Sequence, residues 1–211
     1  MSSHPTNEPV LNYEPGSKYK SDLKNEIDKQ LEEIIEIPCI VIGKEVYTNN
    51  TVVQVVPHNH KHILANVHLA GKNEIKEACV AAVNAQADWI TLGMEKRAQL
   101  FEKCADLLAN EWRMRINAAT MLNQSKTAFQ AEVDAACELI DFWRFNAHYA
   151  REFHDQLQPL VSPEGTLNTT EIRPLEGFIL AITPFNFTSI CLLYTSPSPR
   201  DATLSRMPSS A

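Results

Sequence analysis

The sequence predicts an α/β protein, and three observations taken in chain order support this fold class. Short runs rich in β-branched residues come first, between residues 39 and 69, and they are punctuated by Gly, Asn and Pro. Apolar residues at helical spacing follow from residue 73 to residue 153. A continuous apolar run, residues 178–182, lies between Gly177 and Pro184. This order predicts a β-hairpin ribbon, then a helical layer, then buried strands of a parallel sheet.

Composition limits the partners that the chain can have. It has 211 residues, of which 44% are hydrophobic, so it is long enough to build one sizeable core. The net charge of -7 gives no basic field for nucleic acid or an anionic membrane surface. The longest apolar runs are far too short to span a membrane. Five widely spaced cysteines without a CxxC pair argue against a disulfide framework and a zinc knuckle, so a reducing compartment and small-molecule or protein partners are expected.

The first elements are a helix and a set of strands. Residues 1–21 are polar and are expected to be a flexible N-terminal segment, and residues 22–190 are expected to form one partial domain. An amphipathic pattern predicts a surface helix over residues 22–37, which Pro38 ends. Hairpin strands are predicted over residues 39–42, 45–47, 51–56 and 63–69.

Four helices and two further strands complete the predicted order. The first helix starts near Asn73 as a cap, and the next two cover residues 94–109 and 112–122. The longest covers residues 127–153, with Ser125 or Thr127 as its cap. Its expected inner face is Phe129, Val133, Ala136, Cys137, Ile140, Arg144 and Ala147. Strands are predicted over residues 167–172 and 177–183, whereas the Ser- and Pro-rich residues 191–211 should form no packed element.

The first candidate functional residue is Asn186, which stands between two phenylalanines just after Pro184. In open α/β sheets, ligands bind beyond the carboxyl ends of the strands, and Pro184 forces an irregular loop at that place. The alternative is a core strand followed by an ordinary turn, in which Asn186 bonds to nearby backbone.

Other motifs are less specific. His58, His60 and His62 alternate as metal ligands on one strand face would, but a solvated turn fits them as well and no carboxylate or Cys is near, so no metal is predicted. The Gly residues never cluster into a phosphate-binding loop. Cys191 has no flanking His to activate it as a nucleophile. The acidic set of Glu132, Asp134, Glu138 and Asp141 fits a solvated face; alternatively, Glu132 faces a pocket and pairs with a substrate ammonium.

Several separated blocks of sequence carry a family resemblance. One set resembles the N-terminal part of the NAD-dependent aldehyde dehydrogenase superfamily. It consists of Trp89, Arg97–Ala98, Phe101, Lys103, Ala105, Leu107–Leu108, Glu176–Phe178 and Thr183–Thr188. Three more blocks, Asn7–Leu11, Gln130–Ala136 and Glu138–Ala147, are similar to the branch of that family that oxidises L-glutamate γ-semialdehyde. The resemblance extends over residues 7–190.

The resemblance implies a partial NAD-binding domain with a β-ribbon, and NAD as the cofactor. The loop of Thr183, Pro184, Phe185 and Asn186 would lie against the nicotinamide through its backbone, and the Asn186 amide would donate to the oxyanion that forms when a cysteine thiolate attacks the aldehyde. Phe187 would line the aldehyde tunnel, and Glu132 would approach the substrate amino group. The product would be glutamate, in proline degradation in the mitochondrial matrix, with the cytoplasm as the alternative location. The full-length protein would be a homo-oligomer.

The chain also departs from the family pattern. After Ile190 the family continues with Gly-Gly-Asn and its catalytic regions, whereas residues 191–211 look like an out-of-frame or adaptor-derived tail. In residues 123–126 the family commonly has Gly before the Lys, which affects only a local turn. We therefore expect the chain alone to be inactive. The alternatives are a non-catalytic fragment that docks on the complete enzyme, and an aldehyde dehydrogenase for a non-amino aldehyde.

Overall fold

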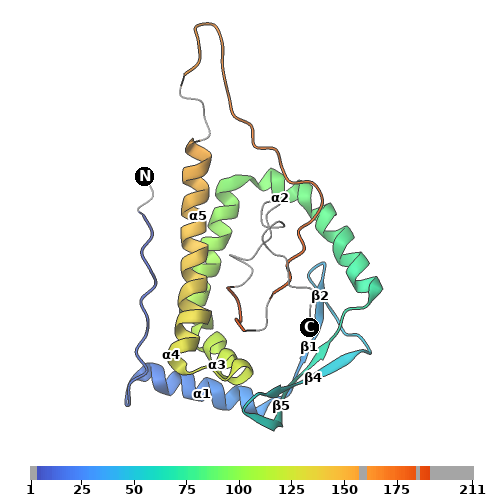
Figure 1. The fold of residues 1–211 in the computed structure, drawn as a ribbon, viewed down its shortest axis with the longest axis vertical. Helices are drawn as coiled ribbons and strands as arrows, with labels where there is room; N and C mark the ends of the chain where they lie inside the picture. Colours follow the sequence, from blue (N-terminus) through green and yellow to red (C-terminus); the bar gives the residue numbers. More distant parts are fainter. Residues whose placement is uncertain (1–3, 157–160, 184–185, 191–211) are drawn as a thin grey trace, which may run out of the picture.

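A computed structural model describes residues 4–156, 161–183 and 186–190 as a mixed helix and strand fold. Figure 1 shows α2 and α5 side by side, with α1 across one end of this pair and the strands beside that end. The helices are α1 (Lys18–Glu32), α2 (Lys72–Leu107), α3 (Arg113–Gln124), α4 (Ala128–Ala131) and α5 (Glu138–Gln156), with two π-helical segments, η1 (Leu108–Trp112) and η2 (Glu132–Cys137). The strands are β1 (Ile35–Ile37), β2 (Cys39–Val41), β3 (Lys44–Val46), β4 (Thr51–Val56) and β5 (Asn59–His68).

The strands form two small sheets. The first has the order β1-β5-β4, in which β4 and β5 are an antiparallel hairpin and β1 is parallel to β5. The second is the β2–β3 hairpin, whose turn residues Ile42 and Gly43 both have positive φ, of 54° and 69°. Such a turn twists in the same sense as the two strands that it joins. The four predicted strands between residues 39 and 69 are confirmed, although β5 begins four residues earlier than expected.

The first helix differs from the prediction at both ends. Helix α1 begins at Lys18 because the Ser17 hydroxyl accepts a hydrogen bond from the Lys20 N–H at 3.2 Å. It ends at Glu32, and the isoleucine-rich residues after it form β1, in which Ile35 pairs with Ala65 of β5. Because β-branched side chains favour strands and a partner strand is available, this stretch is not helical.

The helical layer matches the prediction in its parts but is more continuous than expected. Helix α2 bends at Gly93, where φ is 78° and ψ is 163°, and so consists of the two predicted helices joined at a kink. The first is capped by Gly71, whose N–H donates to the Glu74 carboxylate at 2.7 Å, so Asn73 as the cap was wrong. Thr127 caps α4, while Ser125 takes a left-handed conformation at the end of α3.

The expected inner face of the longest helix is only partly correct. Ala136, Cys137, Ile140 and Ala147 are buried, but Phe129 is 66% exposed. The π-helical segment η2 lies between Phe129 and the buried residues of α5 and accounts for the exposure of Phe129. Because a π-helical turn is wider than an α-helical one, residues before it do not share a face with residues after it at the ordinary helical spacing.

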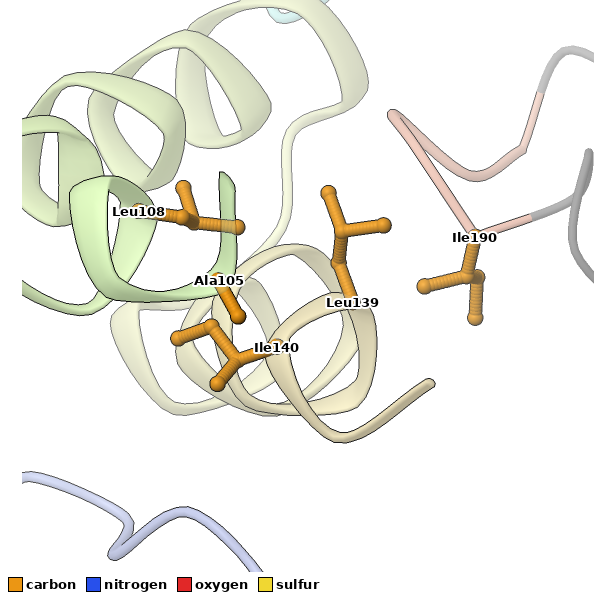
Figure 2. Close-up of a cluster of buried hydrophobic side chains, with 5 residues drawn as sticks. All are labelled: Ala105, Leu108, Leu139, Ile140 and Ile190. Atoms are coloured by element: carbon orange, nitrogen blue, oxygen red, sulfur yellow. The ribbon is translucent and has the colours of Figure 1, made fainter. Parts of the chain in front are cut away.

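Two apolar clusters hold these elements together. Figure 2 shows the larger one, in which Ala105 and Leu108 meet Leu139 and Ile140, while Ile190 approaches from the C-terminal segment on the side of Leu139. Ile190 is only 2% exposed. The smaller cluster joins the sheet to the helices through Val56, Leu64 and Leu122, with Ile27 and Leu31 of α1 packed against it.

The two strands predicted near the C-terminal end are wrong for this structure. Residues 161–183 contain no strand, and the apolar run is exposed, with Ile179 at 67% and Ile182 at 82%. A strand forms only where a neighbour supplies hydrogen bonds. No described strand lies against this run in either sheet, which is why its strand-like sequence does not form a strand.

Gly93 provides a test of this fold. Its backbone lies in a region that is open almost only to glycine, yet no atom lies within 4 Å of the position that a Cβ would take, so a substitution meets backbone strain and no steric clash. We expect Gly93→Ala to lower the free energy of unfolding by about 1–3 kcal/mol, measured by urea denaturation. Thr91→Ala, two residues earlier in regular helix, is the control and should be neutral or slightly stabilising. If both variants unfold with the same free energy, residue 93 does not have the strained backbone conformation that the kink requires.

Candidate functional site

The loop of residues 186–190 carries the main candidate residue. Asn186 lies exposed in a turn, Phe187 is half-buried, and Ile190 is buried in the larger cluster. Thr183 is exposed as well, while Pro184 and Phe185, also predicted to contact the cofactor, lie outside the described residues. The exposed side chain of Asn186 is thus presented to the surface by a loop whose far end is fixed in the core.

Phe187 borders a surface pocket of about 600 Å³. The pocket is lined by Asn7, Asp134, Glu138, Asp141, Phe142, Phe145, Phe187 and Ile190. The Lys126 ammonium lies 4.4 Å from the centre of the Phe187 ring and 2.8 Å from an Asp134 oxygen. Burial, together with the nearby charge of Asp134, raises the pKa of the Glu138 carboxyl. The pocket therefore combines aromatic faces with carboxylates beside the loop.

Glu132 does not belong to that pocket, and both interpretations of it from the sequence are corrected. Its side chain is fully buried, so it lies on no solvated face and faces no pocket. Its Oε1 accepts hydrogen bonds from the Arg113 guanidinium and from the Leu11 N–H, the latter at 2.8 Å. Its Oε2 accepts from the Tyr13 hydroxyl at 2.6 Å and from the Asn117 amide at 2.7 Å. No oxygen is left for a substrate ammonium, and the carboxylate is a structural ion-pair partner.

Arg113 joins this carboxylate to the N-terminal segment. Its guanidinium donates to Glu8 at 2.5 Å and to the Pro9 carbonyl at 2.6 Å. Glu8 also pairs with Arg144 at 2.6 Å, and the Glu8 N–H donates to Asp141 at 2.7 Å. Residues 7–13, expected to be flexible, therefore lie bound along η2 and α5, on the side of α5 away from α2 (Figure 1). We call residues 7–13 the N-terminal strap.

The pKa shifts follow from this arrangement. Burial alone would raise the pKa of Glu132, but the hydrogen bonds from Arg113, Tyr13 and Leu11 outweigh it and hold the pKa below its ordinary value. Burial would lower the pKa of Arg113, which its bonds to Glu132 and Glu8 instead raise. The Cys137 thiol lies in the same centre, and burial together with the Glu132 charge raises its pKa to about 12. A thiol with that pKa is not a nucleophile near neutral pH.

The other motifs show no catalytic arrangement. His58 bonds to the Ser125 hydroxyl at 2.8 Å, and the other two histidines of that set lie in β5. Within residues 4–156, 161–183 and 186–190, no three His, Cys, Asp or Glu side chains are placed to hold a metal ion. In the same part of the chain, no helix is long and apolar enough to cross a membrane.

The sequence did not point to Arg113, Asn117 or Tyr13. Asn117 is fully buried and Arg113 is 4% exposed, in a helix whose pattern gave no reason to expect buried polar groups. One available signal was the set of alanines around Glu132, since small apolar neighbours on both sides favour a buried position over a solvated face.

Comparison with known proteins places this architecture in a family. The model of the aldehyde dehydrogenase family matches residues 27–196, and the chain belongs to that family. The curated relatives that it resembles include Δ1-pyrroline-5-carboxylate dehydrogenase of Agaricus bisporus, which is 43% identical over 88% of this chain and 34% of the relative. The mitochondrial Δ1-pyrroline-5-carboxylate dehydrogenase of Homo sapiens is 45% identical over 87% of this chain and 32% of the relative.

The solved structures agree with this result. The Δ1-pyrroline-5-carboxylate dehydrogenase of Mycobacterium tuberculosis, bound with NAD and cobalamin, superposes with a TM-score of 0.86 at 43% identity, over 90% of this chain and 36% of that chain. The fold is therefore the N-terminal part of an aldehyde dehydrogenase fold. The chain spans about a third of the length of the curated relatives that it matches.

The ion pair between Arg113 and Glu132 gives the first of two predictions for this site. Removing one partner leaves a buried, uncompensated charge, so we expect Arg113→Met to lower the free energy of unfolding by about 3–5 kcal/mol in urea denaturation. Arg115→Met, in the same helix but exposed over the Trp112 ring, is the matched control and should cost less than about 1 kcal/mol. The double variant Arg113→Met with Glu132→Leu should be more stable than Arg113→Met alone. If the double variant is less stable, the unpaired Glu132 carboxylate is not the cause of the lost stability in Arg113→Met.

The depressed pKa of Glu132 gives a second prediction. A carboxylate whose pKa is lower in the folded state stabilises the fold above its unfolded value near 4.5, and this stabilisation is lost as the pH falls further. Glu132→Gln carries no such charge. The difference in unfolding free energy between the native chain and this variant should thus be constant above about pH 5 and shrink toward about pH 3. If the difference in unfolding free energy does not depend on pH, the pKa of Glu132 is not lowered in the folded state.

Proposed function

We propose that this chain is the N-terminal portion of a mitochondrial NAD-dependent dehydrogenase that oxidises L-glutamate γ-semialdehyde to L-glutamate. The observation that carries the proposal is the 43–45% identity to relatives named Δ1-pyrroline-5-carboxylate dehydrogenase, over 87–88% of the chain. The semialdehyde is the open form of Δ1-pyrroline-5-carboxylate, and its oxidation belongs to proline degradation. The mitochondrial location rests on relatives from Dictyostelium discoideum and Homo sapiens that carry this word in their names.

Asn186 is the residue that we assign to catalysis. In the family reaction a cysteine thiolate adds to the aldehyde carbon, and the carbonyl oxygen takes up the negative charge. A neutral amide held at that oxygen stabilises the charge by about 3–4 kcal/mol. Asn186 is suited to this role because its side chain is exposed in a turn while the residues after it are fixed to the helices. Phe187, at the pocket beside it, is assigned to the aldehyde tunnel.

Glu132 is not included among the substrate residues. A substrate ammonium would have to displace Arg113 from a fully buried carboxylate, which would leave the guanidinium without its partner. Recognition of the amino group would then depend on other residues of the longer protein.

NAD is proposed as the cofactor because solved relatives from Mycobacterium tuberculosis are bound with it. When bound, it accepts the hydride from the substrate carbon. Among the described residues, we assign Thr183 and Asn186 to an edge of this site. Thr183 and Asn186 are exposed and open to contact, but no glycine-rich turn of this chain is available to bind the phosphates. For the longer protein we also propose a homo-oligomer, supported by exposed isoleucines such as Ile40 and Ile42 on the β2–β3 hairpin.

The 211-residue chain by itself is proposed to be inactive. The reaction needs a thiolate beside Asn186, and Cys137 is locked in the ion-pair centre with its pKa raised to about 12. Of the other described cysteines, Cys39 lies in β2 and Cys79 and Cys104 lie in α2, on other elements than the loop. Cys191, which has no flanking His in the sequence to activate it, lies outside the described residues. A second candidate, a non-catalytic fragment that docks on the complete enzyme, is favoured by the exposed apolar residues Phe178 to Ile182. It predicts that a tagged chain co-purifies with co-expressed full-length subunits.

The test compares this chain with the product of the longest genomic reading frame that contains residues 1–190. NADH formation is followed with glutamate semialdehyde and with glutarate semialdehyde, which lacks only the amino group. We expect activity from the longer product, with a preference for the amino substrate, and none from the 211-residue chain. In the longer product, Asn186→Ala should lower kcat by about 10²–10³-fold, whereas Asn146→Ala, exposed on α5, should not. Equal rates with both aldehydes would overturn the substrate assignment.

A further inference from the structure

The loop that carries Asn186 is held to the helices by side chains. Among the described residues, no backbone–backbone hydrogen bond joins residues 177–190 to any helix or strand. Side-chain contacts do so instead: Phe187 packs against the larger cluster, and the centre of its ring lies 4.4 Å from the Lys126 ammonium. Ile190 is buried in the larger cluster, Ser189 donates to the Ala135 carbonyl at 3.3 Å, and the Thr188 hydroxyl lies 2.7 Å from the Thr120 hydroxyl. Of the two hydrogen bonds, the one made by Thr188 is the nearer to Asn186.

Thr120 is built into the helix core. It is fully buried on α3, and its hydroxyl donates to the Ile116 carbonyl at 2.8 Å, one turn earlier in the helix. A threonine hydroxyl has one proton, and this bond uses it. Thr188 must therefore be the donor in the pair, and Thr120 the acceptor. The acceptor is rigid, because both its helix position and its rotamer are fixed, whereas the donor lies on the loop.

We propose that Thr120 is a positioning residue for Asn186: its buried hydroxyl fixes the Thr188 side chain and thereby the turn that presents the Asn186 amide. The proposal rests on the function proposed above for Asn186. The apolar contacts of Phe187 and Ile190 hold this part of the loop against the core but fix the direction of no polar group. The Thr120–Thr188 bond acts two residues from Asn186 and is directional, so it sets the orientation of the turn.

The chain offers variants that separate this role from core packing. Thr120→Val keeps the shape of the side chain and removes the acceptor, while Thr120→Ser keeps the acceptor. Thr188→Val removes the donor. Because Thr188 is exposed, this change leaves the core intact, with the Thr120 hydroxyl still bonded to the Ile116 carbonyl. Thr91 is a control for the helix bond alone, because its hydroxyl donates to the Ala87 carbonyl one turn earlier at 2.9 Å; unlike Thr120 it is exposed, and no hydrogen bond joins it to the loop among the described residues.

The experiment measures loop order in the complete 211-residue chain, labelled with ¹⁵N, by the heteronuclear NOE and amide chemical shifts. In Thr120→Val and in Thr188→Val, we expect the signals of residues 186–188 to shift toward unstructured values, with an opening constant about tenfold larger. Thr120→Ser and Thr91→Val should keep the native signals at these residues. The signals of α5 should not change in any of the four variants.

Two outcomes would overturn the proposal. One is an unchanged loop in both valine variants. The other is a shift of α5 signals as large as those of residues 186–188, because Thr120 would then act only through the core. This measurement needs no turnover, so it fails or holds independently of the enzymatic test of Asn186. If the loop is released in the valine variants but kcat is unaffected in Asn186→Ala, the function proposed for Asn186 is wrong, whereas the role of Thr120 in holding the loop stands.

Discussion

The buried ion pair between Arg113 and Glu132 is the interaction around which the helical layer is arranged. A carboxylate that is removed from water is tolerated only when its charge is balanced and its lone pairs are used. Here both conditions are met by groups from distant parts of the chain: Arg113 and Asn117 from α3, and Leu11 and Tyr13 from the N-terminal strap. The polar centre therefore sets where the strap and α3 must lie relative to η2, whereas apolar contacts alone would permit several arrangements.

The π-helical segment η2 makes this centre possible. Glu132 is its first residue, and Ala135, Ala136 and Cys137 are consecutive buried residues within it. In an ordinary helix Ala135 and Ala136 would share the face of Glu132, but Cys137, five residues after Glu132, would lie off that face. The wider turn brings the Cys137 sulfur within 3.6 Å of the Glu132 Oε1.

Local patterns predicted most of the elements but not the polar centre. The hairpin strands and the helices follow from the spacing of apolar residues and from turn residues, which act within a few positions. Glu132 and Arg113 are nineteen residues apart, and Tyr13 is about a hundred residues or more from both, so no local pattern relates them. The apolar run of residues 178–182 shows the converse: its pattern is that of a buried strand, but the structure of a strand depends on neighbours that the described chain does not place beside it.

The same two elements that the ion pair joins also hold the loop of Asn186. Arg113 begins α3, and Thr120, two turns later on that helix, accepts from Thr188. Glu132 begins η2, and Ala135, one turn later, accepts from Ser189. The loop thus lies across the junction of α3 and η2, with the Thr188 hydroxyl bonded to α3 and the Ser189 hydroxyl bonded to η2. Since the ion pair fixes the distance between these sides, it also fixes where the loop can lie. A buried charge that does not line the pocket beside the loop is in this way coupled to the position of the residue that we assign to catalysis.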